Sequence, residues 1–395
     1  MPFDLDLVVV GGCGRVGLPL GLAFADRGLR VGLYDINEQS VAGVSAGTMP
    51  FKEAGASEIL ARVGPEMVVT TDASVVSRAE NIVVVIGTPV DEHLDPSPTA
   101  VPDAVEELAP YLRDGQMLML RSTLYPGVTA MVERLIARLG LQVDVAFCPE
   151  RIAEGAALTE LFDLPQIVAG RTATAQARAE KVFGTIAAST VPLSPEEAEL
   201  AKLFTNTWRY TKFAIANQLF MIANDFGLDF DRIRAAMMLD YPRAADLPTA
   251  GFVAGPCLLK DTLQLAAFNN NKFALGHVSM MINEGLPLYL VSRMEETFDL
   301  ANSTVGILGM AFKGGSDDTR DSLSYKLRRI LRFKAGAVLC TDPHVTTDLS
   351  LVPLDVALQG SDILVLAAPH PEYRNLVTTT PLVDVWGFTG NGSQI

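Results

Sequence analysis

The sequence predicts an α/β protein in which two Rossmann-like parallel-sheet domains are joined by a helical central domain with one long helix. Short apolar runs without polar alternation recur towards both ends of the chain, as strands buried on both faces require. Residues 194–227 run for about thirty positions without an internal helix breaker. Residues 25–35 and 333–343 resemble each other, which is expected if two related sheets flank the helical centre.

Length and composition agree with this division. A chain of 395 residues suggests roughly two or three domains, and we expect them at residues 1–190, 191–298 and 299–395. A hydrophobic content of 49% and a charged content of 19% indicate folded domains rather than disorder. The net charge of −15 argues against nucleic-acid binding, which needs a basic surface. An anionic ligand would therefore be held by a few locally placed cations.

Cysteine usage and the N-terminus bear on the cellular compartment. Four cysteines in a chain of this length fit a reduced compartment better than a disulfide framework. The opening MPFDLDLVVV lacks the basic region of a signal peptide, and no apolar run reaches about 18 residues. We therefore expect a cytoplasmic protein that does not enter the membrane.

The first element is a βαβ unit built around a glycine turn. A strand at residues 5–10 precedes G-x-G-x-x-G, a helix follows, and a second strand ends at Asp35. Such glycines form a tight turn and admit a pyrophosphate to the backbone, while the acid accepts from ribose hydroxyls. This pattern predicts NAD rather than NADP; the alternative is a turn that only packs a strand on a helix. The expected cofactor-binding residues are Gly12, Gly14, Arg15, Val16, Gly17 and Asp35.

The other strands of the first domain are expected at residues 81–89, 116–123, 143–150 and 165–170. The long helix then has clear ends, because Ser194, Pro195 and Glu197 form a capping box and Gly227 suits a helix stop. Its apolar residues repeat at helical spacing, so it packs either within the molecule or against another subunit. They are Leu200, Leu203, Phe204, Ile215, Leu219 and Ile222.

The last hundred residues return to an α/β pattern. A strand at 303–312 precedes a helix at 321–333, and further strands follow at 335–343 and 361–369.

The stretch GFVAGPCLLKDT, residues 251–262, places one cysteine between a glycine- and proline-rich approach and two charged residues. A small buried residue is the usual reading of an isolated cysteine. The approach suggests instead a backbone held close to a ligand, and Lys260 favours the thiolate of Cys257. Local chemistry leaves both readings open. The other cysteines lie in or beside apolar strands and are read as structural: Cys13, Cys148 and Cys340.

Several motifs follow one another along the chain. They are GGCGRVGLPLG, Ser122-Thr123 with Gly127, Cys148-Pro149-Glu150 with Glu154, Lys202 with Asn206 and Asn217, AGPCLLKD around Cys257, and AFKGGSDDTRDS. In these motifs the chain resembles, nearly end to end, the UDP-glucose/GDP-mannose dehydrogenase family of NAD-dependent nucleotide-sugar 6-dehydrogenases. Pro256 departs from the glycine-rich form common in that family; because proline fixes φ and removes an N–H, the sugar preference can differ.

The resemblance implies a four-electron oxidation of the C6 alcohol of a nucleotide sugar to a carboxylate, with NAD as the acceptor. Cys257 would attack the intermediate aldehyde, giving a thiohemiacetal that is oxidised to a thioester and hydrolysed. Lys202 and Asn206, one helical turn apart, would stabilise the oxyanion. Asp261 would hold a water or take a proton. The plain alternative for Lys202 is a solvated charge on an amphipathic helix.

The resemblance assigns further roles in catalysis and cofactor binding. If their segment is helical, Glu150 and Glu154 share the i, i+4 spacing, and one could activate water while the other tunes its basicity. The alternative is a pair of surface acids near a proline turn. Thr123 would lie by the nicotinamide or position the water, and Thr88 and Pro89 would complete the cofactor site.

The expected substrate-binding residues are Lys202, Asn206, Arg243, Phe252, Gly255, Lys313 and Arg320. Arg243 resembles an arginine that reaches the substrate of a neighbouring subunit, which implies a homodimer formed through the central helix. Lys313 and Arg320 would lie near a diphosphate or sugar. Alternatively they form surface salt bridges with Asp317 or Asp318. No metal site is expected.

Two other functions stay in competition with this one. A two-electron dehydrogenase of the 3-hydroxyacid type shares the Rossmann domain and long helices but needs neither Cys257 nor a C-terminal nucleotide-sugar domain. A silent subunit would bind UDP-sugar and NAD without turnover, although the intact catalytic motifs argue against it. UDP-glucose, UDP-N-acetylglucosamine and UDP-N-acetylmannosamine need the same catalytic set, so the sugar stays open, with a lean towards UDP over GDP. The uronic acid product would serve polysaccharide or glycoconjugate synthesis.

Overall fold

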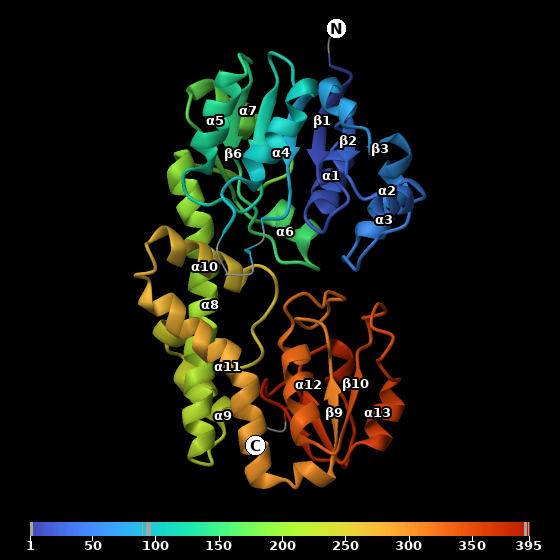
Figure 1. The fold of residues 1–395 in the computed structure, drawn as a ribbon, viewed down its shortest axis with the longest axis vertical. Helices are drawn as coiled ribbons and strands as arrows, with labels where there is room; N and C mark the ends of the chain where they lie inside the picture. Colours follow the sequence, from blue (N-terminus) through green and yellow to red (C-terminus); the bar gives the residue numbers. More distant parts are fainter. Residues whose placement is uncertain (1–2, 89, 92–95, 391–392, 394) are drawn as a thin grey trace. The chain divides into compact units, whose positions relative to one another are not determined.

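The computed structural model describes residues 3–88, 90–91, 96–390, 393 and 395. These residues form two compact units, one up to residue 205 and one from residue 206 onward. Figure 1 shows a large sheet among the N-terminal elements and a smaller one among the C-terminal elements. Among the described residues, no helix has both the length and the apolar character that crossing a membrane requires.

The first unit is built on an eight-stranded sheet with the order β3-β2-β1-β4-β5-β6-β7-β8. The strands are β1 Leu5–Val10, β2 Val31–Tyr34, β3 Val68–Thr70, β4 Ala79–Val84, β5 Met117–Leu120, β6 Asp144–Phe147, β7 Gln166–Gly170 and β8 Thr190–Pro192. β1 to β6 pair in parallel, as predicted, whereas β7 pairs antiparallel to β6 and β8 runs parallel to β7.

Helices cover both faces of this sheet (Figure 1). They are α1 Gly17–Asp26, α2 Glu38–Ser45, α3 Ala56–Val63, α4 Ala100–Leu108, α5 Val128–Arg138, α6 Ala157–Asp163 and α7 Ala173–Phe183, with short 3-10 turns at Gly64–Glu66, Ala73–Arg78 and Ala109–Tyr111. Leu7 and Val9 of β1 belong to the core on one face, and Val8 and Val10 to the core on the other. A strand buried on both faces cannot alternate with polar residues, which explains the continuous apolar run.

The long helix α8 spans Pro195–Asp225 and begins and ends as predicted. The Ser194 hydroxyl and backbone N–H both donate to a Glu197 oxygen at 2.8 Å, and the Glu197 N–H donates back to the hydroxyl at 3.4 Å. This reciprocal pairing satisfies backbone donors that the first turn leaves open. Gly227 takes a left-handed φ of +68°, which glycine adopts without strain just past a helix end.

The second unit packs helices beside a four-stranded parallel sheet with the order β10-β9-β11-β12. The strands are β9 Thr304–Leu308, β10 Ala337–Thr341, β11 Ile363–Leu366 and β12 Leu382–Val383. The helices are α9 Phe230–Met238, α10 Leu258–Phe268, α11 Ala274–Thr297, α12 Leu323–Lys334 and α13 Leu354–Gly360, with 3-10 turns at Pro242–Ala244, Leu300–Asn302 and Pro371–Tyr373.

The helices and the sheet of the second unit share one core. Phe220 of α8 and Leu290 of α11 belong to the same buried cluster as Val305 and Ile307 of β9. The three-domain division, with boundaries near residues 190 and 298, stays a prediction.

Candidate active site

The glycine turn after β1 requires glycine at several positions. Gly11 has a φ of +76°, and a Cβ there would lie 1.9 Å from the Val85 carbonyl oxygen. A Cβ on Gly17 would lie 2.1 Å from the Gly11 oxygen, which explains how α1 packs so closely on the turn. A Cβ on Gly14 would meet nothing closer than the same oxygen at 3.4 Å. Gly14 therefore leaves its backbone open to a ligand, as a pyrophosphate cradle requires.

Asp35 follows β2 and closes the same turn. One carboxylate oxygen accepts from the Cys13 N–H at 2.9 Å and the other from the Asn37 N–H at 3.0 Å. The carboxylate is thus fixed beside the glycine cradle, and this combination fits the ribose and pyrophosphate of NAD. Burial and the Asp35 charge raise the pKa of the Cys13 thiol to about 12, which keeps this cysteine unreactive.

Ser122, which follows β5, forms hydrogen bonds with the segment that follows β4. Its hydroxyl accepts from the Ile86 N–H and donates to the Ile86 carbonyl, both at 2.8 Å. Thr88 and Thr123, expected near the nicotinamide, come directly after this link, and both are half-buried. Pro89 lies outside the described residues.

Glu150 and Glu154 lie in a loop between β6 and α6, so the helical segment that would have placed them on one face is not present. The two carboxylates have different partners. Glu150 forms an ion pair with the buried Arg121. Glu154 Oε1 lies 2.6 Å from Nη1 of Arg15 in the glycine fingerprint. Glu154 therefore lies beside the glycine turn, whereas Glu150 is buried and paired with Arg121.

The predicted lysine and asparagines of α8 are buried. Lys202 and Asn206 are 8% and 4% exposed and lie one helical turn apart. Burial of Lys202 excludes the alternative that it is a solvated surface charge. Asn217 is fully buried further along the same helix.

Cys257 directly precedes α10, and its side chain is exposed. The Asp261 N–H donates to the Cys257 carbonyl at 2.9 Å, which places Asp261 in the first turn of the helix. The Asp261 carboxylate is fully buried, where it accepts from the Asn206 side-chain amide at 2.5 Å and lies 3.0 Å from Lys260 Nζ. The Cys257 thiol is therefore accessible at the first turn of α10, beside the buried Asp261 and its partners.

Burial distinguishes the remaining cysteines from Cys257. Loss of hydration on burial raises the pKa of the Cys148 thiol to about 12 and that of Cys340 to about 11. Both therefore stay protonated, as expected for structural residues.

Asn217 holds the loop that leads to Cys257. Its side chain accepts from the Gly251 N–H at 2.8 Å and donates to the Gly251 carbonyl at 3.2 Å. It also donates to the side chain of Asn283 at 2.9 Å. Asn217 therefore supports the loop rather than presenting its amide to a reacting group.

The loop also approaches aromatic rings closely, and this explains its glycines. A Cβ on Gly255, which has a φ of +100°, would lie 2.5 Å from the Phe312 ring. The side chain of Phe252 is 2% exposed and belongs to the core, so a substrate contact there would involve its backbone.

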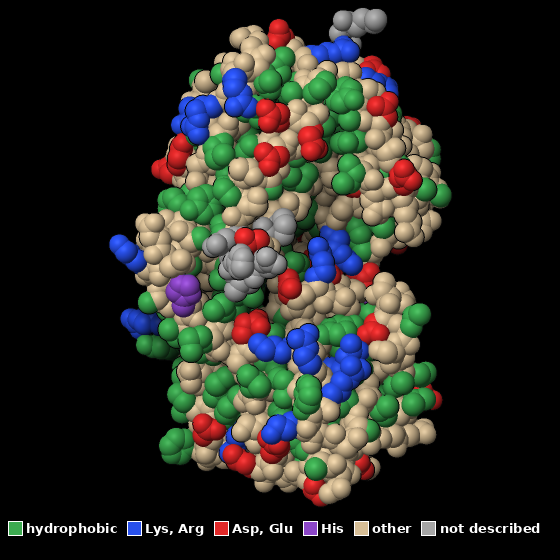
Figure 2. All heavy atoms as spheres, in the orientation of Figure 1, with side chains coloured by type: hydrophobic (Ala, Val, Ile, Leu, Met, Phe, Trp, Pro, Cys, Tyr) green, Lys and Arg blue, Asp and Glu red, His purple; other side chains and the backbone are tan. Residues whose placement is uncertain are grey.

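Further predicted substrate residues lie on exposed or half-buried segments. Arg243 sits in an exposed 3-10 turn, with its guanidinium 5.6 Å from the centre of the Tyr241 ring. Lys313 is half-buried with Nζ 5.6 Å from the Phe312 ring centre. Arg320 is exposed and pairs with Asp318 through Nη2 at 2.6 Å, as the salt-bridge alternative predicts. Figure 2 shows Lys and Arg side chains gathered on the visible face of the second unit, although the chain is acidic overall.

Sequence reasoning missed Asp342, which follows β10 as Asp35 follows β2. Its buried carboxylate accepts from the N–H groups of Met310 and Ala311 after β9, and of His344 and Val345 in its own loop. These bonds and the neighbouring His370 hold the pKa of Asp342 well below its usual range, despite burial. The internal repeat was the sequence feature that could have indicated Asp342, because LYD at residues 33–35 and CTD at residues 340–342 end equivalent strands.

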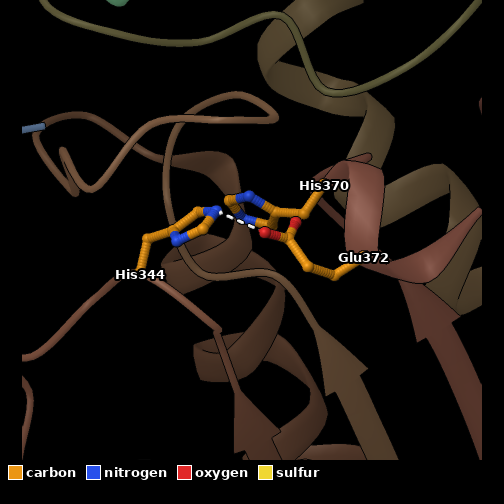
Figure 3. A group of neighbouring side chains, drawn as sticks. All are labelled: His344, His370 and Glu372. Carbon is orange, nitrogen blue, oxygen red and sulfur yellow. Dashed lines mark ion pairs between the residues drawn. The ribbon is translucent and has the colours of Figure 1, made fainter. Parts of the chain in front are cut away.

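His344, His370 and Glu372 lie close to one another (Figure 3), and His370 also contacts Asp342. His344 Nε2 lies 3.1 Å from Glu372 Oε1, whereas His370 Nε2 lies 3.0 Å from Asp342 and its Nδ1 accepts from the Gly315 N–H at 3.1 Å. Both ring nitrogens of His370 are therefore engaged. The group consequently joins the segments after β9, β10 and β11, and its three side chains each bring one ligand atom within 4.8 Å of the others.

Comparison with known proteins agrees with these features. Residues 6–187 match the NAD binding domain of the UDP-glucose/GDP-mannose dehydrogenase family, residues 196–284 its central domain and residues 306–391 its UDP binding domain. A UDP-N-acetyl-D-mannosamine dehydrogenase of Pyrococcus horikoshii is 30% identical, over 93% of this chain and 90% of that protein.

Two solved structures are similar over almost the whole chain. The UDP-D-ManNAc dehydrogenase of Pyrococcus horikoshii has a TM-score of 0.89 at 26% identity, covering 97% of this chain and 96% of its own. The UDP-glucose dehydrogenase of Pyrobaculum islandicum has a TM-score of 0.89 at 27% identity, covering 97% and 94%. With all three domains present in order, this protein belongs to the UDP-glucose/GDP-mannose dehydrogenase family and is an NAD-dependent nucleotide-sugar dehydrogenase.

Proposed function

We propose that the enzyme oxidises the C6 alcohol of a UDP-hexose or UDP-N-acetylhexosamine to the uronic acid, through a covalent intermediate on Cys257. The observation that carries this proposal is the exposed Cys257 at the start of α10, with the Asn206–Asp261–Lys260 group one turn away. UDP-N-acetyl-D-mannosamine is the first substrate to test, because several relatives carry that name.

In the proposed reaction the Cys257 sulfur forms one bond to the substrate carbon and later releases it. The two hydrides would be accepted by two NAD⁺ molecules bound in succession. The alcohol carbon loses a hydride and its oxygen a proton, and the Cys257 thiolate adds to the resulting aldehyde. The anionic thiohemiacetal then loses a second hydride from its carbon, giving a thioester. Water adds and gives up its two protons, the C–S bond breaks, and the carboxylate leaves the regenerated thiolate.

Each neighbouring residue has a physical role in this scheme. Lys202 and Asn206 would donate to the oxygen that becomes negative when the sulfur and later the water add. The buried Asp261 holds the Asn206 amide at 2.5 Å, which fixes the direction of that donor. Asn217 acts earlier in the loop by holding Gly251.

We also propose a homodimer formed through α8. Large apolar side chains are exposed along one stripe of this helix, at spacings of four and seven residues. They are Phe204, Trp208, Ile215 and Ile222 of α8, with Phe226 directly after its last residue. An exposed Arg243 is consistent with a contact to the substrate of the second subunit.

We further propose a cytoplasmic setting, which the four free cysteines support. The product would serve polysaccharide or glycoconjugate synthesis.

The test is the number of NADH molecules formed per sugar consumed, over a panel of UDP- and GDP-hexoses. The proposal predicts two NADH per sugar with a UDP-hexose and names the substrate. One NADH per substrate would instead favour a two-electron dehydrogenase. Binding of UDP-sugar without any NADH would favour a silent subunit.

A further inference from the structure

Glu199 is a buried glutamate near the start of α8, and its carboxylate caps a different helix. The residue is 1% exposed. Oε1 accepts from the Thr129 N–H at 2.8 Å and from the Thr129 hydroxyl at 2.6 Å, and Oε2 accepts from the Gly127 N–H at 2.6 Å. These donors belong to the first turn of α5 and to the residue before it. A helix start leaves N–H groups open and favours a negative charge, so the carboxylate stabilises it.

The carboxylate replaces a cap that the sequence around α5 does not supply. Most helix starts use Ser, Thr, Asp or Asn, whose side-chain oxygen accepts from an N–H of the first turn. In α5 this position is Gly127, which has no side chain. The acceptor comes instead from α8, 72 positions along the chain. The start of α5 and the loop before it therefore depend on α8 for their position.

The loop that joins β5 to α5 is held at both ends. At its start the Ser122 hydroxyl bonds to both backbone groups of Ile86, each at 2.8 Å. At its end Gly127 donates to Glu199. Thr123, the half-buried residue expected beside the nicotinamide, lies between these two attachments. Loss of the second attachment would therefore let Thr123 move.

Glu199 also lies on the same face of α8 as Lys202, which follows three residues later. Both are buried, at 1% and 8% exposed. Both belong to the first unit, as Thr123 does. The bond from Gly127 to Glu199 thus fixes the loop that carries Thr123 against the part of α8 that carries Lys202.

We infer that Glu199 is a positioning residue that acts through Thr123 on hydride transfer to the nicotinamide of NAD. Its carboxylate is buried and already holds three donors, so its effect passes through the loop rather than through contact with a ligand. Displacing a group by about 1 Å can cost on the order of a hundredfold in rate. The inference rests on the sugar oxidation proposed above, but only on its first hydride transfer and not on the covalent step at Cys257.

The experiment measures the rate of the first NADH formed in a single turnover, with saturating NAD and the UDP-hexose that the panel names. It compares wild type, Glu199→Ala, Thr123→Ala and the double variant. Glu199→Ala should slow this step by at least about tenfold, because the nicotinamide and the sugar lose their alignment. The Kd for NAD should stay within about threefold of wild type, because the glycine turn still holds the pyrophosphate.

Two further readouts show which step is slowed and through which residue. With a UDP-hexose deuterated at C6, a primary isotope effect on the slowed step of Glu199→Ala identifies it as hydride transfer. The double variant should be no more than about twofold slower than the slower single variant, because Glu199 acts through Thr123.

A matched control and a milder variant separate positioning from loss of stability. Glu196→Ala removes the same charge from the same helix, but the Glu196 side chain is 51% exposed in its pair with Arg171. It should form the first NADH at the wild-type rate. Glu199→Gln keeps the shape and one acceptor oxygen, so its rate should lie between those of wild type and Glu199→Ala. This variant provides the readout if Glu199→Ala does not fold.

Several results would overturn the inference. They are a wild-type rate of first NADH formation in Glu199→Ala, a Glu196→Ala enzyme that is slowed as much, and a double variant slowed by the product of the two single losses. One NADH per sugar in the wild type would overturn the covalent step at Cys257 alone, because the first hydride transfer would still report on Glu199. No NADH with any UDP- or GDP-hexose would overturn the proposed function, and the inference with it.

Discussion

At the scale of single residues, the four thiols differ in exposure. Cys257 is exposed at a helix N-terminus, whereas Cys13, Cys148 and Cys340 are buried with raised pKa values. At pH 7.5 iodoacetamide should therefore modify Cys257 first and with one equivalent, because alkylation needs an accessible thiolate. Peptide mapping by mass spectrometry checks this, and Cys257→Ser should show no early modification. Faster labelling of any other cysteine would contradict the assignment.

Loss of Asp261 should lower the stability of the second unit. Its buried carboxylate holds the Asn206 amide and pairs with Lys260, whose side chain is 16% exposed. Asp261→Ala leaves both partners without it, so the free energy of unfolding should fall by about 3 kcal/mol. Asp246→Ala is the control, because the Asp246 side chain is 69% exposed in its pair with Lys212, and it should cost less than about 1 kcal/mol. If urea denaturation gave equal losses of unfolding free energy for the two variants, the buried contacts of Asp261 would not stabilise the fold.

At the scale of elements, the local patterns were predictable and the long-range pairings were not. The glycine turn, the strand runs and the α8 capping box depend on neighbours in the sequence, and all are present. The pairing of Arg121 with Glu150 depends on β5 and β6 lying side by side, which no local pattern contains. An arginine next to an apolar strand was the available signal, because such a charge needs a buried partner.

The loop around Glu150 shows why spacing alone misleads. The i, i+4 spacing of Glu150 and Glu154 fits a helix, but Glu150 uses its oxygens to bind the N–H groups of Arg151 and Ile152. Side-chain bonds of this kind offer the backbone an alternative to helical bonding. The Glu154 side chain then points to Arg15, a partner 139 positions away.

The apolar stripe of α8 predicts how the subunits associate. Ile215 and Ile222 are 47% and 49% exposed, two turns apart on one face. Replacing both with glutamate should place charges inside the proposed interface, so light scattering should give the mass of one 42.3 kDa chain where wild type gives twice that mass. Val377→Glu, at a position 93% exposed in the loop after the 3-10 turn Pro371–Tyr373, should remain dimeric. A double variant that stays dimeric would place the interface elsewhere.

At the scale of the whole molecule, the two sheets use equivalent acids differently. Asp35 makes one backbone bond with each oxygen, beside an open glycine cradle. Asp342 binds four N–H groups and His370 and joins three segments of the second sheet. The first sheet thus keeps an acid available for a ribose, and the second uses its acid to hold its own loops. Within the part of the chain that the structure describes, the open glycine cradle beside a strand-end acid is therefore a feature of the first sheet.

The central claim is that Cys257 carries the sugar through the second oxidation. The most direct test compares NADH formed per UDP-sugar consumed in wild type, Cys257→Ala and Cys340→Ala, the last removing a buried thiol from the same unit. Covalent catalysis by Cys257 predicts two NADH per sugar in wild type and in Cys340→Ala. Cys257→Ala should lose full turnover, since no thioester can form. Two NADH per sugar from Cys257→Ala at a rate near wild type would contradict covalent catalysis and leave Cys257 as an exposed residue of the loop.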